Sequence, residues 1–140
     1  MELREITEPR ELEQAFKVIV ELRETLSFSD FLAIYETARE ADQYRLVAAC
    51  EQESYVGVMG YRLLSDFVHG KHLYIDDLVV TKENRSRGIG AQMLEHAEKI
   101  AKALGCRGLR LCTGVQNEAG KRFYERNGWN PRALAYKKML

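Results

Sequence analysis

One segment in the second half of the chain restricts the fold more than any other. HLYIDDLVV (72–80) is apolar enough to be a central strand. A loop containing glycine follows it, and apolar residues then recur at helical spacing over 87–104 until Gly105 ends the helix. RGLRLCTG (107–114) has the composition of another strand. A strand, a helix and a strand in this order predict a right-handed parallel βαβ unit.

The flanking sequence predicts further helices and strands around this unit. Pro9 suits a first helical turn, Ser27 or Ser29 can cap a second helix, and Gly128 suits the end of the last one. In the first stretch expected to be a strand, Leu3 alternates with polar neighbours. The order β-α-α-β-β-β-α-β-α-β predicts an α/β fold with a mixed sheet. We expect strands at 2–7, 44–51, 54–64, 72–80, 107–114 and 132–140, and helices at 9–26, 28–41, 87–104 and 118–127.

Length and composition are those of an ordinary globular domain. The 140 residues suit one domain, 1–140, with 46% hydrophobic and 30% charged residues. No stretch approaches the roughly 20 apolar residues that cross a membrane, and the charged first residues do not resemble a secretory leader. The three cysteines lack metal-ligand spacing and are odd in number, which favours buried thiols in a reducing compartment. We therefore expect a cytoplasmic protein without a membrane partner.

The formal net charge is zero, but the charge is unevenly distributed. Residues 1–70 contain seven Lys/Arg and fourteen Asp/Glu, and residues 71–140 contain fourteen Lys/Arg and seven Asp/Glu. An acidic half that binds a cation and a basic half that binds an anion would explain this asymmetry. The alternative is chance variation between halves that interleave when the chain folds. Basic residues are not interleaved with aromatic ones on one predicted face, which argues against a nucleic-acid partner.

The loop ENRSRGIGAQM (83–93) has the chemistry of an anion site. The first backbone N–H groups of a helix lack partners, and the helix dipole makes that end positive. Gly88 and Gly90 would let an anion approach these amides closely, and Arg85 and Arg87 add positive charge. A P-loop would need Lys followed by Ser or Thr after Gly90, and a dinucleotide-binding loop would need glycine in place of Met93. The loop predicts phosphate or pyrophosphate binding, and a plain helix entrance is the alternative.

Two motifs connect the chain to a known family. LVVTKENRSRGIGAQML resembles motif A of the GCN5-related N-acetyltransferases (GNAT), with Arg85, Gly88 and Gly90 at the characteristic positions. NEAGKRFYERNGW (117–129) resembles motif B of the same family. The expected order of strands and helices matches this family over essentially the whole chain. The resemblance implies the GNAT acyl-CoA N-acyltransferase fold and an N-acetyltransferase activity.

The resemblance also implies where acetyl-CoA binds as cosubstrate. In the family, amides of the motif A loop hold the pyrophosphate, and the pantetheine arm pairs with the end of the preceding strand. The family splays this strand from the next one, often with a bulge, and the pair Asp76–Asp77 interrupts a clean alternation here. The implied contacts are Leu78, Val79, Val80, Arg85, Ser86, Arg87, Gly88, Ile89, Gly90, Ala91, Asn117 and Lys121.

Amine acetylation needs a proton donor for the leaving thiolate, and Tyr124 is the candidate acid. Asn117 and Tyr124 are seven residues apart on the expected helix, so they point the same way, and Gly120 between them leaves the groove open. The family places its usual acid at this tyrosine. Without the family resemblance, Tyr124 would be interpreted as a packed amphipathic side chain, and Asn117 as a helix N-cap.

The amine must also lose a proton, and Asp76 is the candidate base. Carboxylates in an apolar strand are costly unless they are used or paired. Adjacent strand residues face opposite sides, so we expect at most one of Asp76 and Asp77 in the cleft. YIDDLVV is similar to the LED stretch of polyamine acetyltransferases, where the first acidic residue faces the amine, which favours Asp76. In the alternative, Asp77 pairs with a helix arginine, Asp76 contacts water, and ordered water removes the proton.

No other residue set predicts a chemical site. His69, His72 and His96 show no metal or triad spacing, so we expect no metal. A covalent role for Cys112 would need an activating partner that the sequence does not identify.

The sequence thus predicts transfer of an acetyl group from acetyl-CoA to a primary amine of a small molecule or peptide, by direct attack in a ternary complex. The acceptor would enter beside helices 9–26 and 28–41, whose acidic residues favour a cationic amine. A non-catalytic acyl-CoA-binding or regulatory module is one alternative, and a longer donor such as succinyl-CoA is another. Dimers are common in the family, and strand 132–140 is a candidate homodimer interface. The acidic residues are Glu21, Glu24, Asp30 and Glu36.

Overall fold

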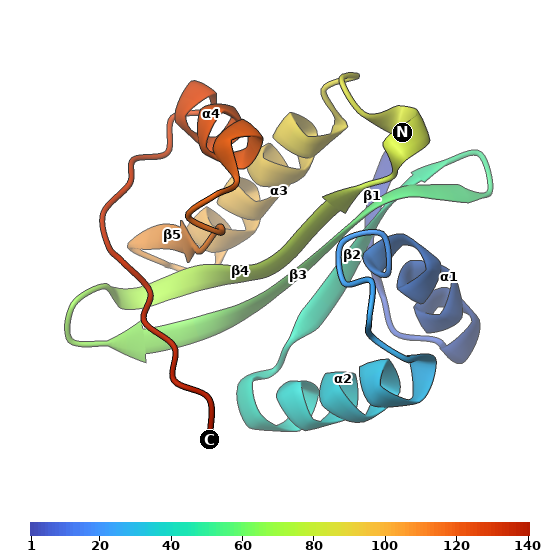
Figure 1. The fold of residues 1–140 in the computed structure, drawn as a ribbon, viewed down its shortest axis with the longest axis horizontal. Coiled ribbons are helices and arrows are strands. Elements are labelled where there is room, and N and C mark those ends of the chain that lie inside the picture. Colours follow the sequence, from blue (N-terminus) through green and yellow to red (C-terminus); the bar gives the residue numbers. More distant parts are fainter. The chain divides into compact units, whose positions relative to one another are not determined.

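The structure is a computed structural model that describes all 140 residues in two compact units, Met1–Arg110 and Leu111–Leu140 (Figure 1). No helix in either unit has both the length and the apolar character that a membrane span requires. The elements, in chain order, are β1 (Glu2–Ile6), α1 (Pro9–Ile19), α2 (Phe28–Asp42), β2 (Arg45–Glu51), β3 (Ser54–Asp66), β4 (Gly70–Val80), the 3-10 turn η1 (Lys82–Asn84), α3 (Ile89–Ala103), β5 (Gly108–Leu111) and α4 (Glu118–Arg126).

The five strands form one mixed sheet in the order β1-β2-β3-β4-β5. The first four strands are antiparallel neighbours. The backbone N–H of Arg107, just before β5, donates to the carbonyl of Lys71 near the start of β4, 2.8 Å away. Because the two strands begin at the same end, β5 runs parallel to β4. The predicted βαβ unit over β4, α3 and β5 is therefore confirmed.

Helices cover both faces of the sheet in the first unit (Figure 1). In β2, Leu46 and Ala48 belong to the core cluster that also contains residues of α1 and α2. Val47 is equally buried but points to the opposite face, as the alternation of a strand requires. On that other face α3 packs closely, since a Cβ at Gly57 would lie 2.9 Å from Sδ of Met93.

The first helix is shorter than the sequence predicted. We expected a helix over 9–26, but α1 ends at Ile19 and the chain continues through turns to Ser27, the N-cap of α2. The apolar spacing that suggested a longer helix indicates which side chains are buried, but it does not show which backbone groups form helical hydrogen bonds. Leu26 packs against the core from this turn segment, so it satisfies the pattern without being helical.

The strand predicted at 132–140 is wrong, because these residues form no strand and pair with no other segment in the structure. Apolar residues stabilise a strand only where a sheet edge and an apolar surface are available. Here the large apolar side chains of the segment are exposed. They are Leu134, Tyr136, Met139 and Leu140.

Candidate functional site

A β-bulge in the middle of β4 creates the most distinctive feature of the first unit. Gly60 of β3 pairs with Asp77 and Tyr61 pairs with Ile75, so Asp76 is an extra residue without a partner in β3. The extra residue breaks the alternation of side chains, and both Asp76 and Asp77 line the same pocket. The expected bulge is therefore present, and the expectation that only one of the two carboxylates enters the cleft is wrong.

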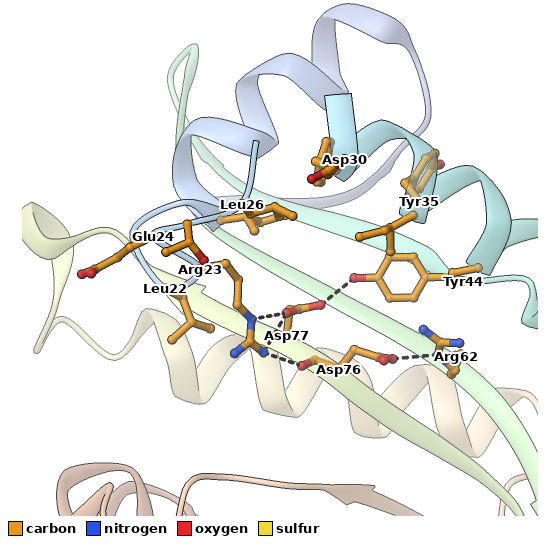
Figure 2. Close-up of a pocket in the computed structure, with 15 residues that line it drawn as sticks. Leu22, Arg23, Glu24, Leu26, Asp30, Tyr35, Tyr44, Arg62, Asp76 and Asp77 are labelled. Carbon is orange, nitrogen blue, oxygen red and sulfur yellow. Dashed lines mark hydrogen bonds and ion pairs between the residues drawn. The ribbon is translucent and has the colours of Figure 1, made fainter. Parts of the chain in front are cut away.

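Asp77 is held by contacts from two directions (Figure 2). Arg23, in the turn after α1, donates from Nε and Nη2 to Oδ1 of Asp77 at 3.2 and 3.0 Å, and also from Nη2 to the carbonyl of Asp76 at 3.3 Å. The hydroxyl of Tyr44 donates to Oδ2 of Asp77 at 2.9 Å. Burial, reinforced by Asp77, raises the pKa of Tyr44 well above its usual value, so this phenol remains a donor.

Gly60 makes the contact between Tyr44 and Asp77 possible. The Tyr44 hydroxyl lies directly over Gly60, and a Cβ at this position would overlap it. Gly60 also faces Asp77 across the β3–β4 pair, at the bulge itself. The glycine therefore serves a close approach of side chain to backbone, which is one of the recurrent reasons for glycine inside a strand.

Asp76 has a different environment. Nε of Arg62 donates to Oδ1 of Asp76 at 3.0 Å, while Nη1 of the same guanidinium bonds Oδ2 of Asp42 at 2.6 Å. Burial raises the pKa of Asp76, and the hydrogen bond and charge of Arg62 partly oppose this rise. A carboxyl group with a raised pKa beside a pocket is suited to proton transfer.

The pocket beside these carboxylates has a volume of ≈ 730 Å³. It lies between the segment that joins α1 to α2, α2 itself, and strands β3 and β4, the side on which the sequence predicted the acceptor. Glu24 and Asp30 line it, but Glu21 instead accepts from the backbone N–H of Lys82 at 2.9 Å. Glu36 is exposed and not part of the lining.

Sequence reasoning did not identify the two arginines of this pocket, although an arginine partner for Asp77 was one of its alternatives. Helix α2, strand β2 and part of β3 lie between Arg23 and Arg62 in the chain, and neither arginine belongs to a motif. The only available signal was the cost of burying two carboxylates, which predicts cationic partners but not their positions.

The loop between β4 and α3 has the local geometry predicted for an anion site. Ser86 and Gly88 adopt left-handed backbone conformations, with φ of 64° and 78°, and α3 begins at Ile89 with no side-chain cap. The first backbone bond of α3 runs from Gln92 N–H to the carbonyl of Gly88, so the preceding amides lack helical partners. A Cβ at Gly88 would meet nothing within 4 Å, so the space beside these amides is open.

The two arginines of this loop have unequal surroundings. Arg87 makes a bidentate ion pair with Glu51 at the end of β2, at 3.0 and 2.7 Å, and donates to Oδ1 of Asn84 at 2.5 Å. Arg85 makes only a long bond, 3.4 Å, from Nε to the carbonyl of Val80. Arg87 therefore ties the loop to the β2–β3 hairpin, and Arg85 is the cation that is freer to contact an anion.

The end of β4 has a strand neighbour on one side only. Leu78, Val79 and Val80 pair with β3. On the other side, β5 has four residues and starts level with the beginning of β4, so it ends before these residues are reached. Backbone groups on that edge are available to pair with an extended ligand.

The second unit contains the remaining predicted residues. Asn117 caps α4, because its Oδ1 accepts from Gly120 N–H at 3.0 Å, and a Cβ at Gly120 would overlap this cap. Lys121 donates to the carbonyl of Val115 and to Glu118. Tyr124 packs edge-on against Phe123 and Trp129, and burial raises its pKa. A phenol with a raised pKa keeps its proton at neutral pH, as a proton donor must.

A histidine cluster also escaped sequence reasoning. Asp66, His69 and His72 each place one potential metal-ligand atom within 4.8 Å of the others. In a continuous strand, the spacing of Asp66, His69 and His72 in DFVHGKH (66–72) would not predict a metal site. It becomes informative only once a hairpin turn at Gly70 folds these residues together.

Residues 6–129 match the model of the Acetyltransferase (GNAT) family. The match covers most of the chain, so the protein belongs to this family and is an acyltransferase of the N-acetyltransferase class. The fold supports the assignment through its mixed sheet, the glycine-containing entrance to α3 and the open edge of β4.

Similar proteins include acetyltransferases from bacteria and animals. An uncharacterised N-acetyltransferase of Bacillus subtilis (strain 168) is 29% identical over 87% of this chain and 86% of its own. A thialysine N-epsilon-acetyltransferase of Bos taurus is 27% identical over 80% of this chain and 74% of its own. The structure of aminoglycoside N-acetyltransferase AAC(6')-Iy in complex with CoA has a TM-score of 0.85 at 19% identity, covering 99% of this chain and 95% of that one.

Proposed function

We propose that this protein transfers an acetyl group from acetyl-CoA to a primary amine of a small molecule or peptide, by direct attack in a ternary complex, with residues 1–140 acting as one domain. The observation that carries the proposal is the bulge that directs Asp76 and Asp77 into a pocket of ≈ 730 Å³. Relatives named for thialysine and aminoglycoside acetylation, and a CoA-bound neighbour, support an amine acceptor and this donor.

The residues at the entrance to α3 fit the pyrophosphate of acetyl-CoA. Unpaired amides at a helix N-terminus attract negative charge, and Gly88 leaves the space beside them open. Arg85 would contact the phosphates directly, and Arg87 would hold the loop in place through Glu51. The pantetheine arm would pair with the free edge of Leu78–Val80. Motif B would add contacts from Asn117 and Lys121.

The acceptor that suits the pocket is a cationic amine. Asp76, Asp77, Glu24 and Asp30 give the lining four carboxylates against the two guanidinium groups of Arg23 and Arg62. Arg23, whose side chain is 49% exposed, already places a cation on Asp77. An ammonium group from the acceptor would bind beside or in place of Arg23, using the same carboxylate oxygens.

The proposed reaction moves protons both from the amine nitrogen and to the leaving sulfur. Asp76, directly or through a water molecule, accepts a proton from the ammonium so that the amine nitrogen has a free electron pair. Acetyl-CoA supplies a thioester carbonyl, to which the nitrogen bonds while the carbon–sulfur bond breaks. Tyr124 gives its hydroxyl proton to the departing sulfur, and its raised pKa keeps that proton available. The nitrogen, which carries one surplus proton once it has bonded to the carbonyl carbon, returns that proton to the Tyr124 oxygen, and Asp76 releases its own proton to solvent.

A thiol-release screen of amines with acetyl-CoA tests this proposal. Polyamines, amino acids, aminoglycosides and a peptide with a free N-terminus should be compared, with acetylated products identified by mass spectrometry. At least one amine should release CoA in proportion to acetylated product. CoA binding by calorimetry without release for any amine would instead favour the non-catalytic acyl-CoA-binding module. Faster release from succinyl-CoA would favour the longer donor.

Two adjacent residues provide a matched pair for the base assignment. Asp76→Asn and Asp77→Asn remove the same charge from neighbouring positions in the same pocket. If Asp76 accepts the proton, Asp76→Asn should lower kcat by roughly 10²–10⁴-fold. The same change should abolish the acidic limb of the pH–rate profile. Asp77→Asn should retain that limb and act mainly on KM. The reverse pattern would assign the base to Asp77.

A further inference from the structure

The hairpin between β3 and β4 brings together three side chains that bind transition metals. Asp66 ends β3, His69 lies in the turn and His72 follows in β4. Each offers one ligand atom, and the three atoms lie within 4.8 Å of one another. The cluster is a group outside the acceptor pocket, whose lining includes none of the three. Nothing in the proposed acetyl transfer uses it.

The separation of Asp66 and His69 already suits a shared ion. Nδ1 of His69 lies 3.2 and 3.3 Å from the two carboxylate oxygens of Asp66. Two ligands bonded to a tetrahedral zinc ion at about 2.0–2.1 Å lie about 3.3 Å apart. An ion can therefore replace the proton between these two groups with little movement of either side chain.

His72 is oriented as metal-binding histidines commonly are. It is buried, with 1% of its surface exposed, and its Nδ1 lies 2.9 Å from the carbonyl of Gly70. Because a carbonyl only accepts hydrogen bonds, Nδ1 carries the proton and Nε2 carries the free electron pair. A backbone carbonyl on one ring nitrogen fixes the tautomer and leaves the electron pair of the other nitrogen able to bind a metal.

A cation already uses this electron pair. Nε of Arg110 donates to Nε2 of His72 at 3.3 Å, a long hydrogen bond. The guanidinium of Arg110 also lies over the ring of Tyr74, with its carbon 4.6 Å from the ring centroid. Arg110 thus has a second favourable contact that it keeps if a metal ion takes Nε2.

We propose that Asp66, His69 and His72 bind one divalent transition-metal ion of the zinc class, and that Arg110 competes with it for Nε2 of His72. Two imidazole nitrogens and one carboxylate oxygen suit zinc, whereas magnesium and calcium prefer oxygen ligands. Three protein ligands leave a coordination position for water. The ion would join the end of β3 to the start of β4 and thereby fix the hairpin.

Calorimetric titration of the tag-free protein with ZnCl2 tests the site, with MgCl2 as the comparison. Wild-type protein should bind one zinc ion per chain, and Co²⁺ should give the visible absorption of a four-coordinate site. His69→Ala and Asp66→Asn should each weaken zinc binding tenfold or more. His96→Ala removes a histidine of α3 outside the cluster and should bind like wild type. Circular dichroism confirms that each variant is folded.

Arg110→Gln gives a test that unfolding cannot imitate. This change removes the competing cation, so zinc should bind more tightly than to wild type. Tighter binding in Arg110→Gln together with weaker binding in His69→Ala supports the proposal. No zinc binding by the wild type, or equal binding by His69→Ala and His96→Ala, overturns it. Unchanged affinity in Arg110→Gln overturns the competition with Arg110.

Discussion

Arg62→Gln should shift the acidic limb of the pH–rate profile to higher pH if Asp76 is the base. Burial raises the pKa of Asp76, and Arg62 lowers it through a hydrogen bond and its charge. Glutamine removes the charge and keeps a hydrogen-bond donor. The pKa of Asp76 should then rise further, and the carboxylate that accepts the proton forms only at a correspondingly higher pH.

The size of the shift follows from the geometry of the pair. The closest nitrogen and oxygen are 3.0 Å apart, and the side chains are 22% and 23% exposed. Opposite unit charges about 4 Å apart interact by about 1 kcal/mol in water and about 4 kcal/mol at an effective dielectric constant of 20. At 1.36 kcal/mol per pKa unit, this range corresponds to about one to three units. Partial exposure favours the lower half, so we expect about one to two units.

Asp42→Asn is the control, because it should move the same limb in the opposite direction. Asp42 shares the guanidinium of Arg62 with Asp76, and its negative charge raises the pKa of Asp76. Its removal should therefore lower that pKa by a smaller amount. The assay is kcat/KM against pH for wild type and both variants. If both variants leave the acidic limb in place, Asp76 is not the group that titrates.

Three further changes test the remaining parts of the site. Tyr124→Phe should lower kcat roughly 10²–10⁴-fold in steady-state assays with little change in KM for acetyl-CoA; normal turnover would make the hydroxyl structural. Gly88→Asp should weaken CoA tenfold or more by calorimetry, since it puts a carboxylate beside the α3 amides; unchanged affinity in a folded variant would refute the pyrophosphate assignment. Gly60→Ala should lower the free energy of unfolding, measured by chemical denaturation, by about 1–3 kcal/mol because the new Cβ displaces Tyr44. Tyr44→Phe should lower it by less; equal losses would contradict the overlap between this Cβ and the Tyr44 hydroxyl.

The parts of the fold that the sequence predicted are those specified locally. Helical spacing over 87–104 and the stop at Gly105 are properties of neighbouring residues, and α3 spans Ile89–Ala103. The turn before α3 is local in the same way, because Gly88 there has a left-handed backbone conformation; binding of a pyrophosphate by this loop stays a prediction. Residues 132–140 show the limit of such reasoning, since the strand expected there is absent from the structure.

The pocket depended on contacts that no local pattern encodes. The bulge at Asp76 arises from the register between β3 and β4. This register is set along the whole length of ten residue pairs and not by the residues next to Asp76. Arg23 reaches Asp77 across 54 positions of sequence, from a turn that the apolar pattern had assigned to a helix. One extra residue in a strand therefore reversed the expected direction of a carboxylate.

The difference between the two carboxylates also follows from their partners. A buried carboxylate is costly unless it is paired, and each of these is paired with an arginine. Asp77 is held by Arg23 and by the buried phenol of Tyr44, so it suits the fixed role of positioning a cation. Asp76 shares its arginine with Asp42, and burial raises its pKa, so we propose Asp76 as the carboxylate that takes up the proton. The bulge thus gives adjacent residues of one strand access to the same pocket with different chemistry.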